Sequence, residues 1–267
     1  MSVEGHPLKG KVALITGGSR GIGAGITRKL ASWGCKVAVN YVDRHAPAKK
    51  IAAELAGQGV EVSLHCADIS IPEEIERLMG EVGARYGHLN ILVQNAAANK
   101  FSQLEKGTLV HWEFVQNTNA RSTWLLAKHA LPLMKGRSGA RYITITNSTP
   151  HRIIQNAGMF AAAKTTLEAL TRYLSYELAP FGIVVNCLRP GRVKTGVFNV
   201  RPDFYFADDH EHAVSPWGSE RVTTVQDCGD AVAMLCLDEA QWIAGQVIPV
   251  DGGYGLWCNL RPYQTGG

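Results

Sequence analysis

The chain has 267 residues, of which 46% are hydrophobic and 19% charged, and its formal net charge at pH 7 is +4. This length is sufficient to bury a large core, and the composition is that of an ordinary globular protein. The small positive charge is not gathered into a run of lysines and arginines, so neither nucleic acid nor an anionic membrane is indicated as a partner. No apolar run reaches the ~18 residues that a membrane span needs. The six cysteines are scattered rather than paired, which indicates a reducing, cytoplasmic location.

Short apolar runs and longer helical patterns alternate along the chain. The expected strands are 11–17, 36–41, 60–68, 89–96, 140–147, 182–190 and 245–253. The expected helices are 21–33, 46–57, 72–86, 109–135, 157–181 and 225–237. Strands that are apolar throughout, and that are followed by helices, predict a parallel sheet covered on both faces. The sequence therefore predicts a single Rossmann-type, doubly wound α/β domain over residues 1–267.

Residues 196–224 depart from this alternation, because they are polar and aromatic with weak periodicity. They follow the carboxyl end of an expected strand, where long irregular segments usually cover a ligand. We therefore expect a substrate lid over 196–224. Its aromatic side chains favour an apolar or aromatic small molecule, and nearby cations are available for an anionic group: Phe198, Phe204, Tyr205, Phe206 and Trp217, with Arg192, Lys194 and Arg201.

The turn after the first expected strand has the form of a phosphate-binding loop. Its sequence, TGGSRGIG over Thr16–Gly23, opens a helix within a strand–helix–strand unit. Gly17 and Gly21 permit a tight turn, and Gly23 permits close packing of helix on strand. The helix N-terminus then directs its N–H groups at an anion. A dinucleotide cofactor is therefore predicted.

The spacing TGxxxGxG resembles that of the short-chain dehydrogenase/reductase family, and further segments extend the resemblance over nearly the whole chain. These segments are CADIS with Asp68, QNAAA at 94–98, QNTNARSTWLL with Asn119, RPGRVKTG at 189–196 and VDGG at 250–253. QNAAA keeps Asn95 but has Ala97 where the family has glycine. The resemblance implies that Asp68 holds the adenine ring and that Val193 and Thr195 hold the nicotinamide carboxamide. The implied cofactor-binding residues are Gly17, Ser19, Arg20, Gly21, Ile22, Gly23, Asn40, Tyr41, Asp68, Ile69, Asn95, Ala96, Lys164, Pro190, Gly191, Val193 and Thr195.

The choice between the two nicotinamide cofactors depends on the end of the second expected strand. A protein that binds NAD needs an acid there to accept hydrogen bonds from the ribose. Here Tyr41 follows Asn40, so nothing repels a 2′-phosphate. Arg20 and Arg44 are available to pair with that phosphate. The predicted cofactor is NADP(H).

The catalytic positions that the resemblance implies are altered. The family has a serine on the fifth strand, a tyrosine that transfers the proton, and a lysine four residues after the tyrosine. Counting back from Lys164 puts Phe160 in the tyrosine place and Asn147 in the serine place, while Asn119 matches an asparagine that supports a water relay. The adjacent Ser148 is expected to face the other side of the strand. General acid catalysis is worth ~10²–10⁴-fold, so the loss of the tyrosine disfavours ordinary ketone reduction.

Three interpretations remain open at this point. In the first, hydride is added to an activated C=C or C=N bond, and Phe160 offers its π-face to the cation in the case of an iminium substrate. In the second, a carbonyl is reduced with His151 or Tyr205 as the acid. In the third, bound NADP(H) belongs to a non-redox protein, either a rearrangement or cyclisation catalyst or a regulatory binder.

Asn147 is open to two interpretations: it satisfies local backbone groups, or its amide donates to a substrate oxygen. The acidic and histidine-rich stretch 208–212 matches no metal signature, so no metal is expected.

Members of the family that the chain resembles usually assemble through the two long helices, here 109–135 and 157–181. A homotetramer or a dimer is therefore expected.

Overall fold

The computed structural model describes residues 6–193, 195 and 222–256. Most of the expected lid, 196–221, lies outside the described residues, and so do Lys194, Tyr205 and the stretch 208–212. The expected α/β fold is confirmed within the described part. The strands are β1 Val12–Thr16, β2 Lys36–Tyr41, β3 Val62–Cys66, β4 Ile91–Gln94, β5 Ala140–Ile145, β6 Ile183–Pro190 and β7 Val247–Val250.

All seven strands are parallel and form one sheet in the order β3-β2-β1-β4-β5-β6-β7. Its helices are α1 Gly21–Ser32, α2 His45–Gly57, α3 Pro72–Tyr86, α4 Leu109–Gln116, α5 Ser122–Met134, α6 Gly158–Leu178 and α9 Val225–Leu235. Short helical turns are η1 Leu104–Lys106, η2 Asn117–Arg121, η3 Ala179–Phe181, η4 Asp238–Ala240 and η5 Tyr254–Leu256. The strand order reverses between β1 and β4, and ligands of such sheets bind at that point, beyond the carboxyl ends of the strands.

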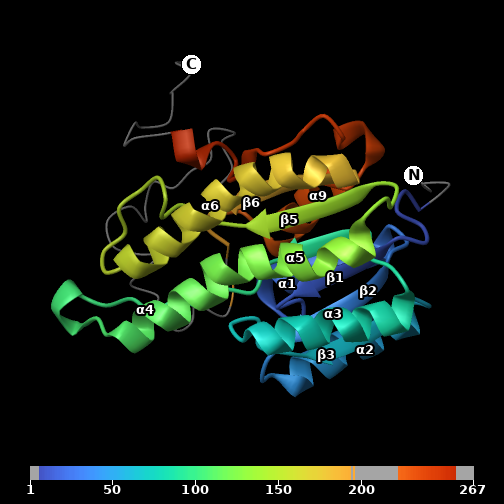
Figure 1. Cartoon of the computed structure of the whole chain (residues 1–267), viewed down its shortest axis with the longest axis horizontal. Helices are drawn as coiled ribbons and strands as arrows, with labels where there is room; N and C mark the ends of the chain where they lie inside the picture. Colours follow the sequence, from blue (N-terminus) through green and yellow to red (C-terminus); the bar gives the residue numbers. More distant parts are fainter. Residues whose placement is uncertain (1–5, 194, 196–221, 257–267) are drawn as a thin grey trace, which may run out of the picture.

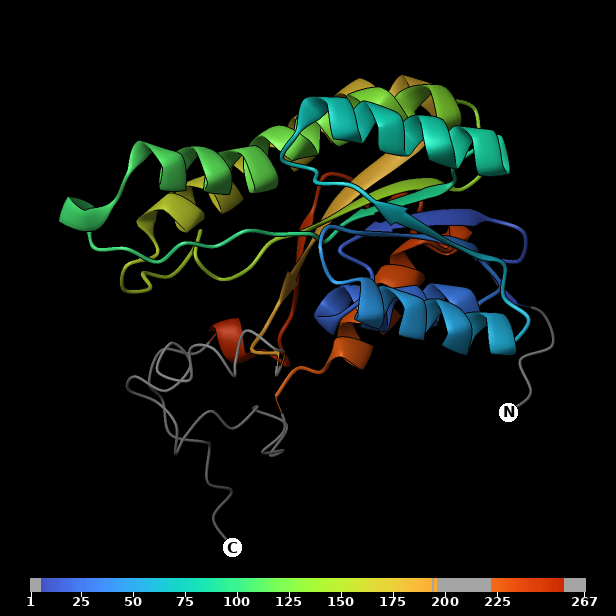
Figure 2. The ribbon, with the colours of Figure 1, turned by 90° about the horizontal axis from the view of Figure 1, so that it is seen from below.

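Helices cover both faces of the sheet, as Figure 2 shows, and two hydrophobic layers hold them there. One layer joins the sheet to α1, α2 and α9 through side chains such as Ile26, Ile51 and Val232. The other joins it to α3, α5 and α6 through side chains such as Leu78 and Leu126. Since strands covered on both faces must be apolar on both sides, the continuous apolar runs in the sequence are explained.

Helix boundaries follow local chemistry. Helix α3 begins at Pro72, which needs no N–H partner there, and ends before Gly87, whose φ of 73° is left-handed. Helix α9 begins with a reciprocal capping box between Thr224 and Asp227.

Among the described helices, none has both the length and the apolar character that a membrane crossing requires.

The expected single helix over 109–135 is interrupted, which is the main difference from the sequence-based expectation. Helix α4 runs into α5 through a π-helical turn, η2, that contains Asn119 (Figure 1). Such turns insert one extra residue into the helix and are frequent at functional sites. The interruption therefore directs attention to Asn119.

Candidate active site

The glycine turn has the geometry that its sequence predicts. Gly17 and Gly21 have φ values of 60° and 53°, in the left-handed region that side chains disfavour. A Cβ atom on Gly23 would lie 2.2 Å from the carbonyl oxygen of Gly17, so only glycine fits there. Ser19 is buried in the turn, and Ile22 is half-buried in the first turn of α1. No side chain caps the start of α1 at Arg20, which leaves its N–H groups available to an anion.

Asn95 and Thr16 join the ends of β4 and β1 at the point where the strand order reverses. The amide nitrogen of Asn95 donates to the carbonyl oxygens of Thr16 and Gly17 at 3.0 and 3.1 Å. The hydroxyl of Thr16 accepts the backbone N–H groups of Asn95 and Ala96 at 3.0 and 3.1 Å. The loops after β1 and β4 are thereby held side by side, where a dinucleotide would cross the sheet.

Asn40 and Tyr41 at the end of β2 have different surroundings. Asn40 is fully buried; its side chain accepts the N–H of Gly17 at 3.3 Å and donates to the carbonyl of Ala67 at 2.9 Å. It therefore holds the glycine turn in place, and its assignment to the cofactor site stays a prediction. Tyr41 is half-buried, and its hydroxyl lies 3.1 Å from Nδ1 of His45. Among the described residues, no carboxylate is hydrogen-bonded to this pair.

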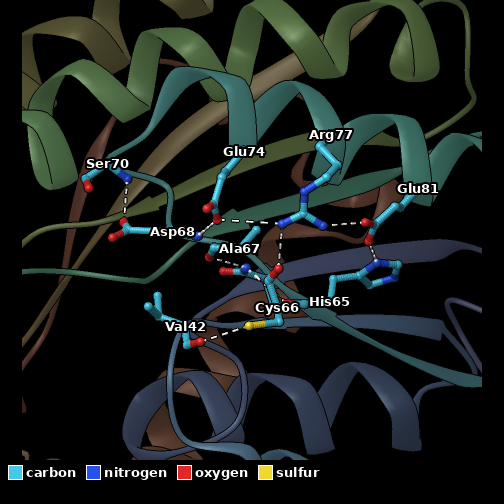
Figure 3. A network of polar contacts seen from close by, with 10 residues as sticks. Val42, His65, Cys66, Ala67, Asp68, Ser70, Glu74, Arg77 and Glu81 are labelled. Carbon is cyan, nitrogen blue, oxygen red and sulfur yellow. Dashed lines mark hydrogen bonds and ion pairs between the residues drawn. The ribbon is translucent and has the colours of Figure 1, made fainter.

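Asp68 lies in a network of charged residues beyond β3 (Figure 3). Its Oδ1 accepts the N–H of Ser70 at 2.8 Å, and its own N–H donates to Glu74 at 2.5 Å. Arg77 joins Glu74 and Glu81 and donates to the carbonyl of Cys66 at 2.8 Å. The network fixes the strand end that carries Asp68, whereas its neighbour Ile69 is buried in the core.

The segment after β6 reaches back to the glycine turn. Pro190 ends β6, and Gly191 is so tightly enclosed that a Cβ atom would lie 2.6 Å from the hydroxyl of Thr223. Val193 is buried, and the methyl carbon of Thr195 lies 3.5 Å from the place that a Cβ of Gly21 would occupy. Residues far apart in the chain therefore lie side by side at the glycine turn.

Lys164 and Phe160 lie one turn apart on the same face of α6, and Lys164 reaches the end of β5. Both are buried, at 3% and 7% exposure. The ammonium of Lys164 donates to the carbonyl of Ile145 at 2.8 Å and lies 5.7 Å from the centroid of the Phe160 ring. Burial lowers the pKa of Lys164 from 10.5 to about 8, although Cys187 and Glu168 oppose the shift. The lysine therefore stays mostly charged at neutral pH in an apolar setting.

Phe101, from the loop after β4, completes this apolar wall. Its ring contacts Phe160 edge to face, with 6.1 Å between centroids. The loop is fastened by the N–H of Ser102, which donates to the carbonyl of Asn156 at 2.9 Å. Asn156 itself has a left-handed φ of 63°, which asparagine tolerates. The loops before α4 and before α6 are thus joined directly over Phe160.

Asn119 is fully buried within the π-helical turn. Its amide nitrogen donates to the carbonyls of Ala98 and Val115 at 2.7 and 2.8 Å. Its Oδ1 is buried and has no hydrogen-bond partner among the described residues. A buried acceptor without a partner usually marks a place for a water molecule or a ligand. The two hydrogen bonds that the Asn119 amide nitrogen donates link the loop after β4, at Ala98, to α4, at Val115.

Asn147 lies just beyond β5, in a turn rather than in the strand. Its Oδ1 accepts both the N–H and the hydroxyl of Thr149, at 2.9 and 2.6 Å. The amide nitrogen makes no hydrogen bond within the described residues, so its two N–H groups remain available. The two interpretations of Asn147 are therefore compatible, because one end satisfies local groups and the other end can donate.

His151 is bound to an acid that sequence reasoning missed. Its Nε2 lies 3.0 Å from Glu168, which is 5% exposed and also accepts the hydroxyl of Thr146 at 3.0 Å. Glu168 is eight residues beyond Phe160 on α6, a separation of about 12 Å along the helix. His151 is consequently held away from Phe160, which weakens its candidacy as a substitute acid. Glu168 follows Lys164 by four residues, and this spacing was the signal that places it on the same helix face.

Comparison with known proteins agrees with these features. The family model described as enoyl-(acyl carrier protein) reductase matches residues 17–255. A hydroxynaphthalene reductase-like protein of Metarhizium robertsii is 34% identical over 92% of this chain and 95% of its own length. Versicolorin reductase 1 of Aspergillus parasiticus is 31% identical over 94% of this chain and 98% of its own.

The chain belongs to the short-chain dehydrogenase/reductase family. A crystal structure of a short-chain dehydrogenase from Burkholderia cenocepacia in complex with NADP superposes with a TM-score of 0.83, at 28% identity. That match covers 93% of this chain and 99% of the other. Among the described residues of the present chain, no cluster of side chains is suited to a metal ion.

Proposed function

We propose that this protein transfers a hydride from NADPH to an activated C=C bond of a small aromatic or apolar metabolite, without a tyrosine acid. The chain is an NADP-dependent oxidoreductase by family, by the reductases among its relatives, and by the NADP-bound neighbour. The observation that carries the finer proposal is the burial of Phe160, one turn before Lys164 and packed against Phe101. In this proposal, Phe160 stands at the family position of the proton donor, so that position has an apolar ring.

The chemistry of conjugate reduction suits this arrangement. When hydride adds to the β-carbon of an enone, the electron pair of the C=C bond moves and negative charge develops on the carbonyl oxygen, two carbons away. The enolate takes its proton from water, on oxygen or on the α-carbon, after the hydride has been transferred. No acid is therefore needed at the place of Phe160 for the transfer itself. The free amide of Asn147 is a candidate donor to that oxygen, as an N–H group in an oxyanion hole is. The charge of Lys164 adds favourable potential for the developing enolate.

An iminium substrate fits less well than a neutral enone. Lys164 already places a cation 5.7 Å from the centre of the Phe160 ring. A second cation on that ring would be repelled by the ammonium, which remains charged at neutral pH. The same geometry therefore favours the neutral acceptor over the cationic one.

The cofactor preference follows from the surface around Tyr41. Arg20 is exposed at the start of α1, and Arg44 is exposed before α2. Arg44 lies between Tyr41 and His45 in the sequence, and Arg20 lies in the glycine turn; within the described residues neither arginine has an ion pair, so both can meet a 2′-phosphate. A preference for NADPH over NADH is therefore part of the proposal.

The proposed assembly uses the outer faces of α5 and α6. These helices lie side by side over one face of the sheet (Figure 1), and they expose Trp124, Tyr173 and Tyr176 at 46%, 68% and 85%. Large exposed aromatic side chains of this kind mark protein contacts. We propose a homodimer, or a tetramer that contains it, joined through these faces.

The proposed reaction is tested with a matched pair of substrates, benzylideneacetone and benzylacetone, which differ only in the C=C bond. With NADPH, wild-type protein is expected to reduce the enone and to leave the saturated ketone nearly untouched. Phe160→Tyr should raise activity on the ketone by about tenfold or more, since it restores an acid beside Lys164. Phe160→Leu, which changes the ring but adds no hydroxyl, should bring no such gain. Rapid reduction of benzylacetone by wild type would contradict the proposal.

A further inference from the structure

Two arginines and a tyrosine from three separate loops meet beyond the carboxyl ends of β5, β6 and β7. Arg152 lies in the loop after β5, Arg192 in the loop after β6, and Tyr254 at the start of η5. The Cζ atom of each arginine is 5.1 Å from the centroid of the Tyr254 ring. Both distances fall within the range of cation–π contacts. The carboxyl end of a doubly wound sheet is also where its ligands bind.

The group formed by Arg152, Arg192 and Tyr254, called the stack below, is anchored by backbone contacts. Arg152 donates to the carbonyls of Tyr254 and Gly255, both at 3.2 Å. Asp251 accepts the N–H groups of Gly253 and Gly255, both at 2.9 Å, which shapes the turn that carries Tyr254. A guanidinium held against a ring loses little freedom on binding a ligand. The position of Arg192 beside Tyr254 is therefore set in advance.

Within the described residues, no carboxylate lies within 4.0 Å of the Arg192 guanidinium, and the guanidinium makes no hydrogen bond there. The acid in this turn, Asp251, is already engaged by two backbone N–H groups. A half-buried guanidinium whose donors are unused within the described residues is suited to a carboxylate or a phosphate, which it binds through two parallel hydrogen bonds.

The stack lies within reach of the glycine turn. Arg192 precedes by three positions Thr195, which packs against that turn. Three residues of extended chain span at most ~11 Å. A molecule bound beside the glycine turn can therefore extend as far as Arg192.

From these observations we infer that Arg192, held by Tyr254, binds an anionic group of the substrate. This inference rests on the proposed function, because it assigns the anion to the molecule that receives the hydride. The preferred substrate is then an aromatic compound that carries a carboxylate or a similar anion in addition to its acceptor carbon. Tyr254 and Arg152 act as positioning residues for Arg192.

The test compares naphthoate with naphthamide, two probes of the same shape of which only the first is charged. Binding to protein saturated with NADP⁺ is measured by calorimetry, so that no hydride transfer is needed. Wild type is expected to bind naphthoate about tenfold more tightly than naphthamide, and salt should reduce this preference. Arg192→Met should remove most of the preference by weakening naphthoate alone. Arg137→Met, which removes an exposed cation in the turn before β5, is the matched control and should change neither affinity.

Two further readouts make the outcome decisive. Tyr254→Leu keeps both charges but removes the ring, and should weaken naphthoate by a smaller factor than Arg192→Met. Equal affinity of wild type for both probes would overturn the inference, and so would an Arg192→Met variant that loses NADP⁺ affinity, since the cation would then serve the cofactor. Because the probes are not reduced, a failure of the proposed reaction and a failure of this inference give different results.

Discussion

Lys164 is the residue whose surroundings most constrain the chemistry. Its pKa falls from 10.5 to about 8 because burial disfavours the charged form. Between these two values the unfolded chain binds one more proton than the folded chain, so this lysine makes the fold more stable as pH rises from about 8 to 10.5. At pH 7 its burial is a cost, on the order of 3 kcal/mol at about 1.4 kcal/mol per pKa unit. The simplest reason for keeping a buried charge that lowers stability is that the charge has a function.

The first prediction concerns Lys164→Met, which removes this charge and keeps the apolar stem. The free energy of unfolding at pH 7 should be retained or increased, because no ammonium is then buried. The affinity for NADPH should fall by about tenfold or more if the ammonium binds the ribose, as hydrogen bonds to charged groups contribute about 1.5–3 kcal/mol. Urea unfolding and a fluorescence titration measure the two effects. A variant that loses stability and keeps its cofactor affinity would show that Lys164 has only a structural role.

The same residue predicts a dependence on pH. Lys164 is charged below its pKa of about 8 and neutral above it. NADPH affinity of the wild type should therefore decline as pH rises from about 7 to about 9, whereas Lys164→Met should show a flatter profile. Both proteins are titrated at each pH, and the ratio of their dissociation constants gives the part that Lys164 contributes.

Arg20 carries the second prediction at this scale. If its guanidinium meets the 2′-phosphate, Arg20→Ala should weaken NADPH by about tenfold and leave NADH nearly unchanged. The exposed position of Arg20 makes loss of folding an improbable cause of any change. Equal weakening of both dinucleotides would instead assign Arg20 to the pyrophosphate.

Among the elements, the packing of α1 on α9 explains how the glycine turn is held in place. Gly25 of α1 lies against Val225, and a Cβ atom there would be 2.3 Å from its carbonyl oxygen. Gly229 of α9 approaches the carbonyl of Gly25 in turn, with 2.7 Å for an added Cβ. The two helices touch backbone to backbone, so the start of α1 is fixed against a second helix.

Gly25→Ala should therefore destabilise the protein and weaken cofactor binding together, because α1 must shift away from α9. A loss of about 2 kcal/mol or more is expected, in the range of overpacked cores. Gly80→Ala in α3 is the matched control: no atom lies within 4 Å of the added Cβ, and the higher helix propensity of alanine should stabilise the protein by up to about 1 kcal/mol. An unfolding temperature below that of wild type for Gly25→Ala, and above it for Gly80→Ala, would confirm the contact.

The elements also show what the sequence could and could not predict. Strand and helix positions were predictable because apolar runs and glycines act locally, as at Gly17 and Gly87. The π-helical turn at Asn119 was not, since its sequence reads as ordinary helix and its side-chain contacts reach Ala98, 21 residues away. Asn40 was assigned to the cofactor site from its position in the chain, whereas its hydrogen bond with the glycine turn is seen only in the fold. The Arg192–Tyr254 contact joins residues that no local pattern connects.

For the whole molecule, the exposed aromatic side chains of α5 and α6 predict association. Trp124→Glu together with Tyr176→Glu should convert the wild-type oligomer into smaller species, because charges would be buried in the contact. Analytical ultracentrifugation measures the change. Tyr41→Phe, far from this face, serves as a control and should leave the oligomer intact. A monomeric wild type at micromolar concentration would contradict the proposed assembly.

The central claim is that hydride reaches a carbon remote from the oxygen that gains charge, in a site where Phe160 provides no proton. The most direct measurement uses NADPH that carries deuterium at the transferable C4 position, with benzylideneacetone as the acceptor, and locates the label in the product. The account predicts benzylacetone with deuterium at the β-carbon. Deuterium on the carbinol carbon of an unsaturated alcohol would contradict it, because hydride would then have entered the carbonyl and another group would have to supply the proton.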